Sequence, residues 1–387
     1  MIRTAFVSTY PPRQGGVATF TQHLAAAVGG REIVAIHAQD LPAPYPLEVH
    51  HRIRRDELDD YPRTAEALSG CADVVAIQHE FGLWGGEHGE SVLSFAAALD
   101  VPAIATLHSV PATPTGPQHD VLAELVRRVA ATVVMSPSAA TLLAERYAAD
   151  PRRIHVIPHG IPDLPLQDAE TLKPAVGMAG RDLMLSFGLL APRKGYELVL
   201  AALPEIIAAR PDATYAILGV THPDLAVTDG EAYRESLVAE VKRRKLGSHV
   251  QFVDRFVGRV ELTRWLEAAD VILAPHTDDG HRASGTLAYA MGAGRAIVST
   301  PHPYALDQLA DGAGVIVPAA DPAALAAAVI ELLGDPEARD AIGRTAHDRS
   351  RSMTWWNVAA QYRTLLARVQ ANPVRGRSSI RSIALQA

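Results

Sequence analysis

Short apolar segments alternate with helix-like patterns along most of this sequence, and no other feature restricts the possible folds as strongly. The clearest example is residues 278–300, DDGHRASGTLAYAMGAGRAIVST. This stretch predicts a polar loop, then a helix over 286–291 capped by Ser284, then a strand over Ala296–Ser299. Strands that alternate with helices are typical of parallel sheets with helices on both faces. The sequence therefore predicts an α/β fold.

The loop before the helix at 286–291 is also a candidate ligand site. Small residues that lead into a helix N-terminus leave backbone N–H groups free at the positive end of the helix dipole, which suits a phosphate. An ordinary connection with a well-capped helix would explain the same residues. A similar order of strand, Gly15-Gly16 loop and helix occurs near the N-terminus. There the glycines would let the backbone approach a ligand, or would form a tight turn.

Several predicted strands in the first half of the chain end at residues suited to ligand contact. The strands are expected at Thr4–Ser8, Glu32–His37, 73–77, 102–107, 132–135 and 153–157. His108 follows the fourth of them, at the edge where α/β sheets bind ligands. A single histidine at such a place also suits a core position, so His108 alone is an ambiguous signal.

The segment QHEFGLWGGEHG, at 78–89, is longer and richer in glycine than a minimal connection between strand and helix. Its chemically active or aromatic residues are His79, Glu80, Phe81, Trp84 and His88. A long loop at the carboxyl end of a parallel strand is a typical ligand-contact element. We expect such a loop here; the alternative is a surface loop with one aromatic side chain packed inward.

Proline and glycine interrupt the pattern over 161–180, which predicts a linker between two domains. The alternation then resumes, with strands expected at 183–187, 214–218, Val250–Val253, Val271–Ala274, Ala296–Ser299 and 315–317. We therefore expect an N-terminal domain over 1–165 and a C-terminal domain over 180–350, with a cleft between them. A last helix is predicted over 356–370. The tail, 371–387, lacks a core pattern and is expected to be disordered.

The composition argues against several classes of protein. No run of about 18 apolar residues is present, so no transmembrane helix is expected, and the N-terminus lacks the apolar run of a signal peptide. Cys71 is the only cysteine, which excludes an intrachain disulfide and fits a reducing cytoplasm; we expect it to be a buried small hydrophobe. The net charge of −7 argues against a nucleic-acid partner. The 16 histidines show no HxxxH spacing in a helical context, so no metal site is expected.

Several motifs, taken together and in this order, resemble those of one enzyme family. In the first half they are YPPRQGG before a helix, TLHSV and VIPHG, and in the second half FGLLAPRKG and LAYAMGAGRAIVST. Over residues 1–370 the chain resembles the family 4 retaining glycosyltransferases of the GT-B fold. The resemblance implies two facing Rossmann-like domains with parallel sheets and a cleft between them. The last helix, 356–370 here, would cross back to the first domain.

The resemblance also implies an activity. The C-terminal domain would bind a sugar linked to UDP or GDP, and the N-terminal domain would bind a hydroxyl acceptor such as a saccharide, a glycoconjugate or a small molecule. A hexose, mannose or glucose, would be transferred with retention at the anomeric carbon, in the cytoplasm, without a metal or another cofactor. Peripheral contact with a membrane is compatible with such an enzyme.

Carried over by position, the resemblance assigns roles to individual residues. Gly15 and Gly16 would face the donor diphosphate, and His108 would lie beside the transferred sugar. Lys194 would stabilise the negative charge of the departing diphosphate. The residues expected to bind the donor are Gly15, Gly16, Gly188, Arg193, Lys194, Phe256, Ala283, Ser284, Gly285, Thr286 and Tyr289.

The sequence departs from the family pattern at two places. Leu189 stands where the family usually has an arginine, for which Arg193 could substitute. Two glutamates of the family are also missing. The second falls on Tyr289, and the first falls on His281 when counted back from the helix, or on Asp279 when counted forward from the strand. We favour His281, and the catalytic candidates are His108, Lys194, His281 and Asp279.

Two other functions remain open at this point. The missing glutamates favour a protein that binds a sugar nucleotide or a glycan without catalysis, whereas Lys194, His108 and both glycine-rich loops favour an enzyme. A sugar-nucleotide epimerase with a GT-B-like fold would need acid and base carboxylates in the cleft. Glu80 and Asp279 are the candidates for that chemistry.

Overall fold

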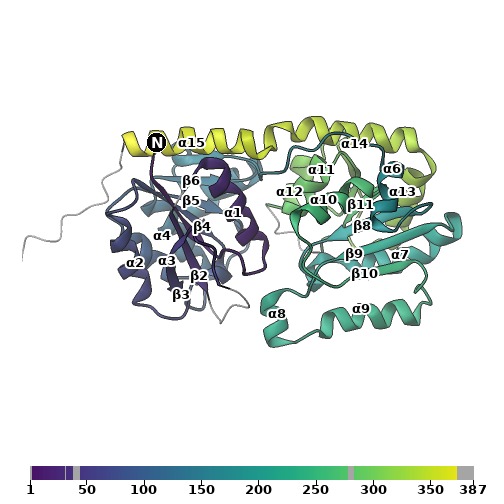
Figure 1. Cartoon of the computed structure of the whole chain (residues 1–387), viewed down its shortest axis with the longest axis horizontal. Helices are drawn as coiled ribbons and strands as arrows, with labels where there is room; N and C mark the ends of the chain where they lie inside the picture. Colours follow the sequence, from purple (N-terminus) through teal and green to yellow (C-terminus); the bar gives the residue numbers. More distant parts are fainter. Residues whose placement is uncertain (1, 31, 38–43, 278–282, 373–387) are drawn as a thin grey trace, which may run out of the picture. The chain divides into compact units, whose positions relative to one another are not determined.

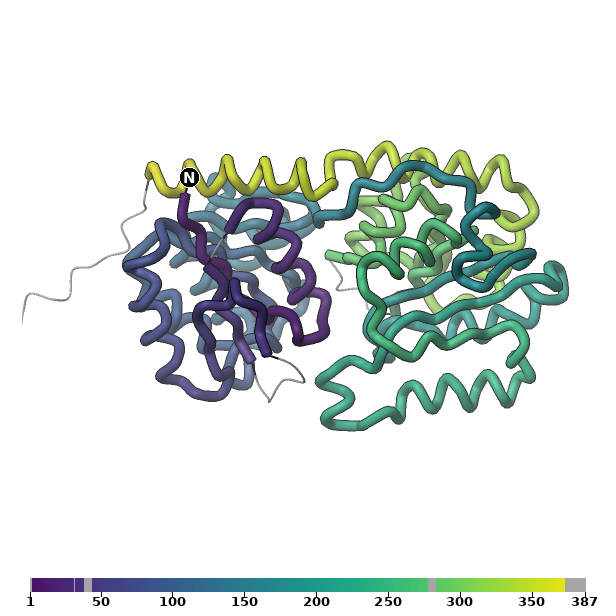
Figure 2. The backbone as a smooth tube through the Cα atoms, in the orientation of Figure 1, coloured from purple at the N-terminus to yellow at the C-terminus, as the bar shows by residue number. Residues whose placement is uncertain are grey.

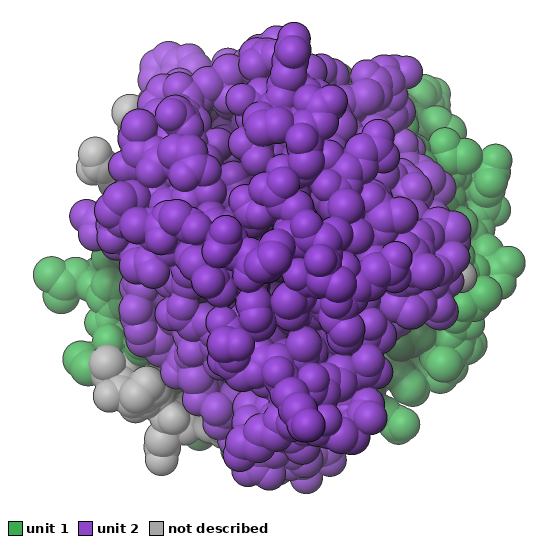
Figure 3. Space-filling model, turned by 90° about the vertical axis from the view of Figure 1, so that its right-hand side faces the viewer, with its two compact units in different colours: residues 1–13, 17–158, 358–387 green, residues 14–16, 159–357 purple. Residues whose placement is uncertain are grey.

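The structure is a computed structural model that describes residues 2–30, 32–37, 44–277 and 283–372. The chain divides into two compact units, which Figure 3 shows in different colours. Unit 1 consists of the described residues of Met1–Arg13, Val17–Pro158 and Val358–Ala387. Unit 2 consists of Gln14–Gly16 and the described residues of His159–Asn357.

Unit 1 is built around a parallel sheet that has seven strands in the described part of the chain (Figures 1 and 2). The strands are β1 (Thr4–Ser8), β2 (Glu32–His37), β3 (Val49–Arg54), β4 (Val74–His79), β5 (Ala103–Leu107), β6 (Ala131–Val134) and β7 (Ile154–Val156). Their order across the sheet is β3-β2-β1-β4-β5-β6-β7. Every residue of β1, β4 and β5 is buried, as expected for strands that are covered on both faces.

Helices cover both faces of this sheet (Figure 1). They are α1 (Gly16–Val28), α2 (Asp60–Leu68), α3 (Ser91–Ala97), α4 (Gly116–Arg128), α5 (Pro137–Tyr147) and α15 (Trp355–Ala371), with short 3-10 turns η1 (Phe81–Leu83) and η2 (Pro151–Arg153). Alternate strand residues such as Val7 and Ile77 share one core cluster with side chains of α2 to α5. Thr106 points to the opposite face, where its Oγ1 lies 2.9 Å from the hydroxyl of Tyr362 on α15.

Unit 2 repeats this plan with a parallel sheet of six strands among the residues described. The strands are β8 (Asp182–Phe187), β9 (Ala213–Leu218), β10 (Val250–Val253), β11 (Val271–Ala274), β12 (Ala296–Ser299) and β13 (Val315–Ile316). Their order is β10-β9-β8-β11-β12-β13. The expected strands of the second half are thus confirmed, with small differences at their ends.

The helices of unit 2 lie on both faces of its sheet as well. They are α6 (Ala169–Leu172), α7 (Tyr196–Ala209), α8 (Pro223–Thr228), α9 (Ala232–Arg243), α10 (Arg259–Ala268), α11 (Gly285–Gly292), α12 (Pro303–Gln308), α13 (Pro322–Gly334) and α14 (Pro336–Ser350), with 3-10 turns η3 (Lys173–Val176), η4 (Pro192–Lys194) and η5 (Arg351–Met353). One core cluster joins α7, α9 and α13 to alternate strand residues, among them Met184, Tyr215 and Leu273.

Both sheets reverse their strand order at the equivalent place. In unit 1 the chain moves outward from β1 in one direction and then from β4 in the other, and in unit 2 it does so from β8 and from β11. In open parallel sheets the carboxyl ends of the two strands at such a reversal border a ligand-binding crevice. The topology therefore points to the ends of β1 and β4 and to the ends of β8 and β11.

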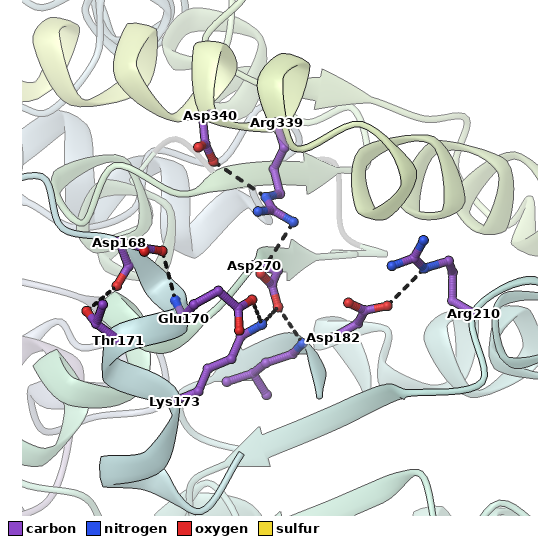
Figure 4. Close-up of polar contacts among 10 residues, drawn as sticks. Asp168, Glu170, Thr171, Lys173, Asp182, Arg210, Asp270, Arg339 and Asp340 are labelled. Carbon is purple, nitrogen blue, oxygen red and sulfur yellow. Dashed lines mark hydrogen bonds and ion pairs between the residues drawn. The ribbon is translucent and has the colours of Figure 1, made fainter. Parts of the chain in front are cut away.

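A buried ion pair anchors the start of unit 2 (Figure 4). The side chains of Lys173 and Asp270 are each 1% exposed, and Nζ of the lysine lies 2.8 Å from Oδ2 of the aspartate. The backbone N–H of Leu183 donates to the same oxygen at 2.7 Å, and Arg339 lies 3.4 Å from Oδ1. Burial raises the pKa of Asp270, and the neighbouring Lys173 opposes that shift. The segment 161–180, expected to be a linker, is thus packed into unit 2 through Lys173.

One strand was not predicted. The sequence of β3, VHHRIR, contains four polar residues in six, and only Val49 and Ile53 are buried. Its pairing with β2 places it at the edge of the sheet, where one side of the strand has no partner strand among the described residues. Within the described ranges, no helix combines the length and the apolar character that crossing a bilayer requires.

Candidate functional site

The reversal point of unit 2 carries a small pocket at the carboxyl ends of β8 and β11. Its cavity volume is about 10 Å³, enough for about one water molecule. The lining residues are Ser186, Phe187, Lys194, Tyr196, Leu273, Ala274, Pro275, His276 and Thr286. Lys194 and Thr286, which the sequence predicts to bind the donor, come together here. Gly188 lies beside them, because a Cβ at this position would be 3.6 Å from Oγ1 of Thr286.

Lys194 supplies a positive charge at this pocket. Its Nζ lies 3.2 Å from Nε2 of His276, which is buried. Burial, together with the charge of Arg193, lowers the pKa of Lys194 to about 8. With the lysine as ammonium donor, Nε2 of His276 is the acceptor of this contact. A lysine with this pKa gains charge readily when an anion binds next to it.

Gly195 holds the loop of Lys194 against the end of β11. Its φ is +65°, and a Cβ there would lie 1.9 Å from the carbonyl oxygen of Pro275. Only glycine tolerates both this left-handed backbone and this approach. The N–H of Thr277 also donates to the carbonyl of Arg193 at 3.1 Å. The Lys-Gly pair of the FGLLAPRKG motif therefore holds the backbone of Lys194 close to the end of β11.

The N-terminus of α11 faces the same region of unit 2. Oγ of Ser284 accepts a hydrogen bond from the N–H of Leu287 at 3.2 Å, which confirms the predicted cap. A Cβ at Gly285 would lie 3.0 Å from Nε2 of His159, so this position has little room for a side chain. Nδ1 of His159 lies 2.8 Å from the carbonyl oxygen of Gly160, so this ring nitrogen donates to it.

Among the predicted donor residues of unit 2 that lie outside the lining of the pocket are Tyr289, Arg193 and Phe256. Tyr289 is 8% exposed, its ring centroid lies 6.1 Å from that of His159, and burial raises its pKa. Arg193 is exposed beside Lys194, and Phe256, after β10, is 39% exposed. Their contacts with a donor stay predictions.

The loop between β11 and α11 is described only in part. Ala283 is half-buried next to the Ser284 cap. Asp279 and His281, the two candidates for the first family glutamate, lie outside the described residues. The choice between them therefore stays a prediction.

In unit 1, side chains from the ends of β4 and β5 meet at the carboxyl edge of the sheet. Nε2 of His108 lies 2.9 Å from Oε1 of Gln78, which is wholly buried, and the N–H of His108 donates to the carbonyl of His79 at 2.9 Å. The ring of Phe20, on α1, packs at right angles against His108 with centroids 4.9 Å apart. With Oε1 of Gln78 as the acceptor, the proton of the neutral imidazole is on Nε2. Gln78 therefore orients a histidine that the sequence identified without this partner.

Trp84, an aromatic residue of the 78–89 loop, packs in the core of unit 1. Trp84 is 1% exposed, its Nε1 donates to the carbonyl of Gln78 at 3.2 Å, and its ring packs between Tyr61 and Phe95 at centroid distances of 5.9 and 5.7 Å. The sequence left two interpretations of this loop, a ligand-contact loop and a surface loop with one aromatic side chain packed inward. The position of Trp84 agrees with the second. His79 is wholly buried, and burial lowers its pKa to about 4, so it is neutral at pH 7.

Glu80, an acidic residue of the same loop, has local hydrogen-bond partners. Oε1 of Glu80 accepts hydrogen bonds from Oγ of Ser109 at 3.0 Å and from the N–H of Phe81 at 3.2 Å. These bonds tie the loop after β4 to the loop after β5. In this arrangement the carboxylate of Glu80 has a structural role, because it holds the two loops together.

The two glycines at the start of α1 are not required by packing. A Cβ built at Gly15 or at Gly16 would meet no atom within 4 Å. The side-chain position of each is therefore open, and contact with a donor diphosphate stays a prediction.

One group of metal-type ligands occurs among the described residues. A ligand atom from each of Glu32, His51 and Cys71 lies within 4.8 Å of the other two. The carboxylate begins β2 and the thiol precedes β4, so the group lies at the amino edge of the sheet. Cys71 is half-buried, and burial raises the pKa of its thiol. It is therefore not the fully buried hydrophobe that the sequence predicts.

The fold and the site first define a class: a protein with two Rossmann-type parallel sheets, the second with a lysine and a capped helix N-terminus at its carboxyl edge. Residues 14–163 match the family described as Glycosyltransferase Family 4, and residues 181–335 match Glycosyl transferases group 1. The chain therefore belongs to the family 4 glycosyltransferases. The resemblance found in its motifs is confirmed.

Three relatives are similar to this chain over different parts of it. A D-inositol 3-phosphate glycosyltransferase of Jonesia denitrificans is 24% identical over 67% of this chain and 64% of its own length. A phosphatidyl-myo-inositol mannosyltransferase of Mycolicibacterium smegmatis is 31% identical over 53% of this chain and 49% of its own. The chain thus spans about half to two thirds of these two relatives. A GDP-mannose-dependent monoacylated alpha-(1-6)-phosphatidylinositol monomannoside mannosyltransferase of Corynebacterium glutamicum is 23% identical over 91% of this chain and 94% of its own.

Solved structures resemble the chain over nearly its whole length. HepE of Anabaena, in complex with UDP and glucose, superposes with a TM-score of 0.77 at 15% identity, covering 95% of this chain and 100% of that one. Sucrose-phosphate synthase of Thermosynechococcus elongatus gives a TM-score of 0.77 at 18% identity, covering 96% and 100%. These likenesses confirm the predicted GT-B fold class with its two parallel-sheet domains.

Proposed function

We propose that this chain is a retaining glycosyltransferase that moves a hexose from a nucleoside diphosphate sugar to a hydroxyl acceptor. The observation that carries the proposal is the position of Lys194 at the strand-order reversal of unit 2, beside the N-terminus of α11. A diphosphate bound there would meet a cation and the free N–H groups at the helix start. Family membership supports the same assignment.

The proposed chemistry is stabilisation of the leaving group. When the bond between the sugar and the diphosphate breaks, negative charge grows on the β-phosphate, and Lys194 with the N–H groups of Gly285 and Thr286 would stabilise it. The acceptor hydroxyl would attack from the same face of the sugar and pass its proton to the leaving phosphate oxygen. His108, oriented by Gln78, would contact the transferred sugar. This scheme requires no metal ion.

The proposed donor to test first is GDP-mannose, with mannose as the transferred sugar. The relative whose match extends over most of both chains carries GDP-mannose in its name, and a second relative is a mannosyltransferase. Inositol phosphates and phosphatidylinositol, which the names of several relatives contain, are the first acceptors to test. Glucose from UDP-glucose is the alternative donor.

The test is release of free nucleoside diphosphate by the full chain, with GDP-mannose, UDP-glucose and ADP-glucose, each with and without an acceptor. We expect release from one donor, faster with an acceptor, and unchanged in a metal chelator. Activity that is lost in the chelator and restored by a divalent cation would contradict the metal-free scheme. No release from any donor with any acceptor would contradict the proposed activity.

A second candidate is a protein that binds a sugar nucleotide without transfer. The observation in its favour is Tyr289, a nearly buried phenol at the position of a family carboxylate. A phenol is a weaker hydrogen-bond acceptor than a carboxylate for sugar or ribose hydroxyls. Thermal stabilisation by a sugar nucleotide without release of its diphosphate would favour this candidate, since a ligand at 100 times its Kd adds about 2.7 kcal/mol to stability.

A further inference from the structure

We propose that unit 1 contains a second anion site, one for a phosphate ester, at the amino edge of its sheet. A cavity of about 190 Å³ lies there between the amino ends of β6 and β7 and the last turns of α15. One water needs only about 10–15 Å³ of such volume, so the cavity can hold a small organic anion. The residues proposed to bind the sugar nucleotide lie elsewhere, at the carboxyl edges of the two sheets.

The polar part of the cavity lining consists mostly of basic residues. Arg152 and Arg153 on η2, His155 on β7 and Arg368 on α15 contribute to it, and none of the lining residues is acidic. These side chains come from three separate elements, so their convergence is a product of the tertiary fold. The lining also includes the amide of Asn372, a neutral donor.

Most of this charge has no carboxylate partner. Arg152 forms an ion pair with Asp150, with Nη2 2.8 Å from Oδ2. Arg153 instead donates to backbone carbonyls, to Ala130 at 3.3 Å and to Arg127 at 3.4 Å, and forms no ion pair with a described residue, although its charge helps to lower the pKa of Asp150. Arg368 forms no ion pair with any residue that the structure describes. An anion in the cavity would therefore meet two cations that form no ion pair with a described carboxylate.

The pKa of His155 responds to the positive charge in the cavity. It is half-buried, and its pKa is lowered by burial and also by the charge of Arg368. A bound anion would act in the opposite direction and would favour the protonated ring, adding a donor to the site. The geometry therefore provides a histidine whose charge depends on occupancy.

The chemistry favours a phosphate ester over a simple inorganic anion. Arginine presents a planar fork of donors that matches phosphate oxygens in pairs. Leu365 and Val369 form an apolar wall of the same cavity, which suits the organic part of an ester. Such an ester could be a soluble metabolite or the headgroup of an anionic lipid, and the two share the recognised group.

The test measures binding to the full chain at constant ionic strength. Glycerol 3-phosphate is titrated by calorimetry, and vesicles of phosphatidylglycerol are compared with vesicles of phosphatidylcholine by co-sedimentation. Arg368→Glu reverses an exposed charge of the site, Arg153→Ala removes the other cation without an ion pair, and Arg344→Glu, an exposed residue of α14 without a described ion pair, is the matched control. We expect each site variant to weaken binding at least about tenfold, the effect of one lost charge-assisted hydrogen bond, while the control does not.

The outcomes separate the sources and decide the proposal. Saturable binding of glycerol 3-phosphate that the site variants weaken supports a soluble ligand, and binding confined to the anionic vesicles with the same dependence supports a headgroup. Binding to neither probe overturns the proposal, as does binding that Arg344→Glu weakens as much as Arg368→Glu. Nucleoside diphosphate release is measured in parallel, and because no site variant touches the pocket of Lys194, the two proposals fail independently.

Discussion

Nζ of Lys194 lies 3.2 Å from Nε2 of His276, although 82 residues separate them in the sequence. The lysine follows β8 and the histidine follows β11, the two strands at the reversal of the unit 2 sheet. The histidine keeps the ammonium partnered while no anion is bound. The pair therefore locates the candidate diphosphate site more narrowly than either residue does alone.

Replacing Lys194 tests its role in the chemistry. We expect Lys194→Ala to lower turnover about 100-fold or more, because the growing charge on the leaving group loses a preorganised cation. Steady-state release of nucleoside diphosphate is the measurement. Lys242→Ala, which removes an exposed lysine of α9, is the control and should leave turnover unchanged. Equal turnover of Lys194→Ala and the wild type would show that Lys194 has no role in the reaction.

The affinity for the nucleoside diphosphate should depend on pH through the same residue. The pKa of Lys194 is lowered to about 8, so the side chain is cationic below that pH and neutral above it. Binding therefore weakens as pH rises from about 7.5 to 9.5, a range in which the diphosphate itself keeps its charge. Calorimetric titrations across this range give the profile. A slope of the same size in Lys194→Ala would show that another group is responsible.

Removing the buried carboxylate of Asp270 should destabilise unit 2. We expect Asp270→Asn to lower the free energy of unfolding by about 3 kcal/mol, because it removes the buried partner of the Lys173 ammonium and leaves this cation, among the described carboxylates, only with the exposed Glu170. Denaturation by urea measures the change. Asp182→Asn is the control, since its ion pair with the part-exposed Arg210 is worth at most about 1 kcal/mol. Similar losses in both variants would mean that burial adds nothing to the Asp270 pair.

The buried His79 should make the protein sensitive to acid. The pKa of His79 is about 4 in the folded protein and near 6.5 in the unfolded chain, so between these values only the unfolded state takes up the proton. Its contribution to stability is complete above pH 6.5 and is lost as pH falls toward 4, by up to about 3 kcal/mol. We expect His79→Leu to reduce the loss of stability between pH 6.5 and 4. An unchanged loss, measured by urea denaturation at both pH values, would contradict this.

The two substitutes for the first family glutamate can be told apart by paired variants. If His281 binds the donor sugar, His281→Ala lowers transfer, the wild type shows a pH dependence near neutrality, and affinity for the bare diphosphate stays nearly constant. If Asp279 does so, Asp279→Asn has that effect and His281→Ala does not. We expect the first result. Normal transfer by both variants would assign the donor sugar to other groups.

The sequence by itself determined the fold class, most of the strands and part of the site. Apolar strands of four to six residues between helical patterns can be stable only as buried parallel strands, and motifs such as the Lys-Gly pair keep their local geometry wherever they occur. The Ser284 cap was predicted in this way and is confirmed, whereas Lys194 came from the family resemblance, and the donor-binding roles of Lys194 and Thr286 stay predictions. β3 was missed because an edge strand of polar residues has little periodic signal.

Only the tertiary structure decided which residues act together. His276 and Gln78 carry no local signal, since each becomes informative through a partner that is distant in the chain: Lys194 for one, His108 for the other. The cationic cavity of unit 1 likewise needs α15 to return Arg368 to the side of β7. Sequence patterns report local periodicity and short-range geometry, whereas hydrogen-bond partners across a sheet are set by strand order, which depends on the packing of the whole unit.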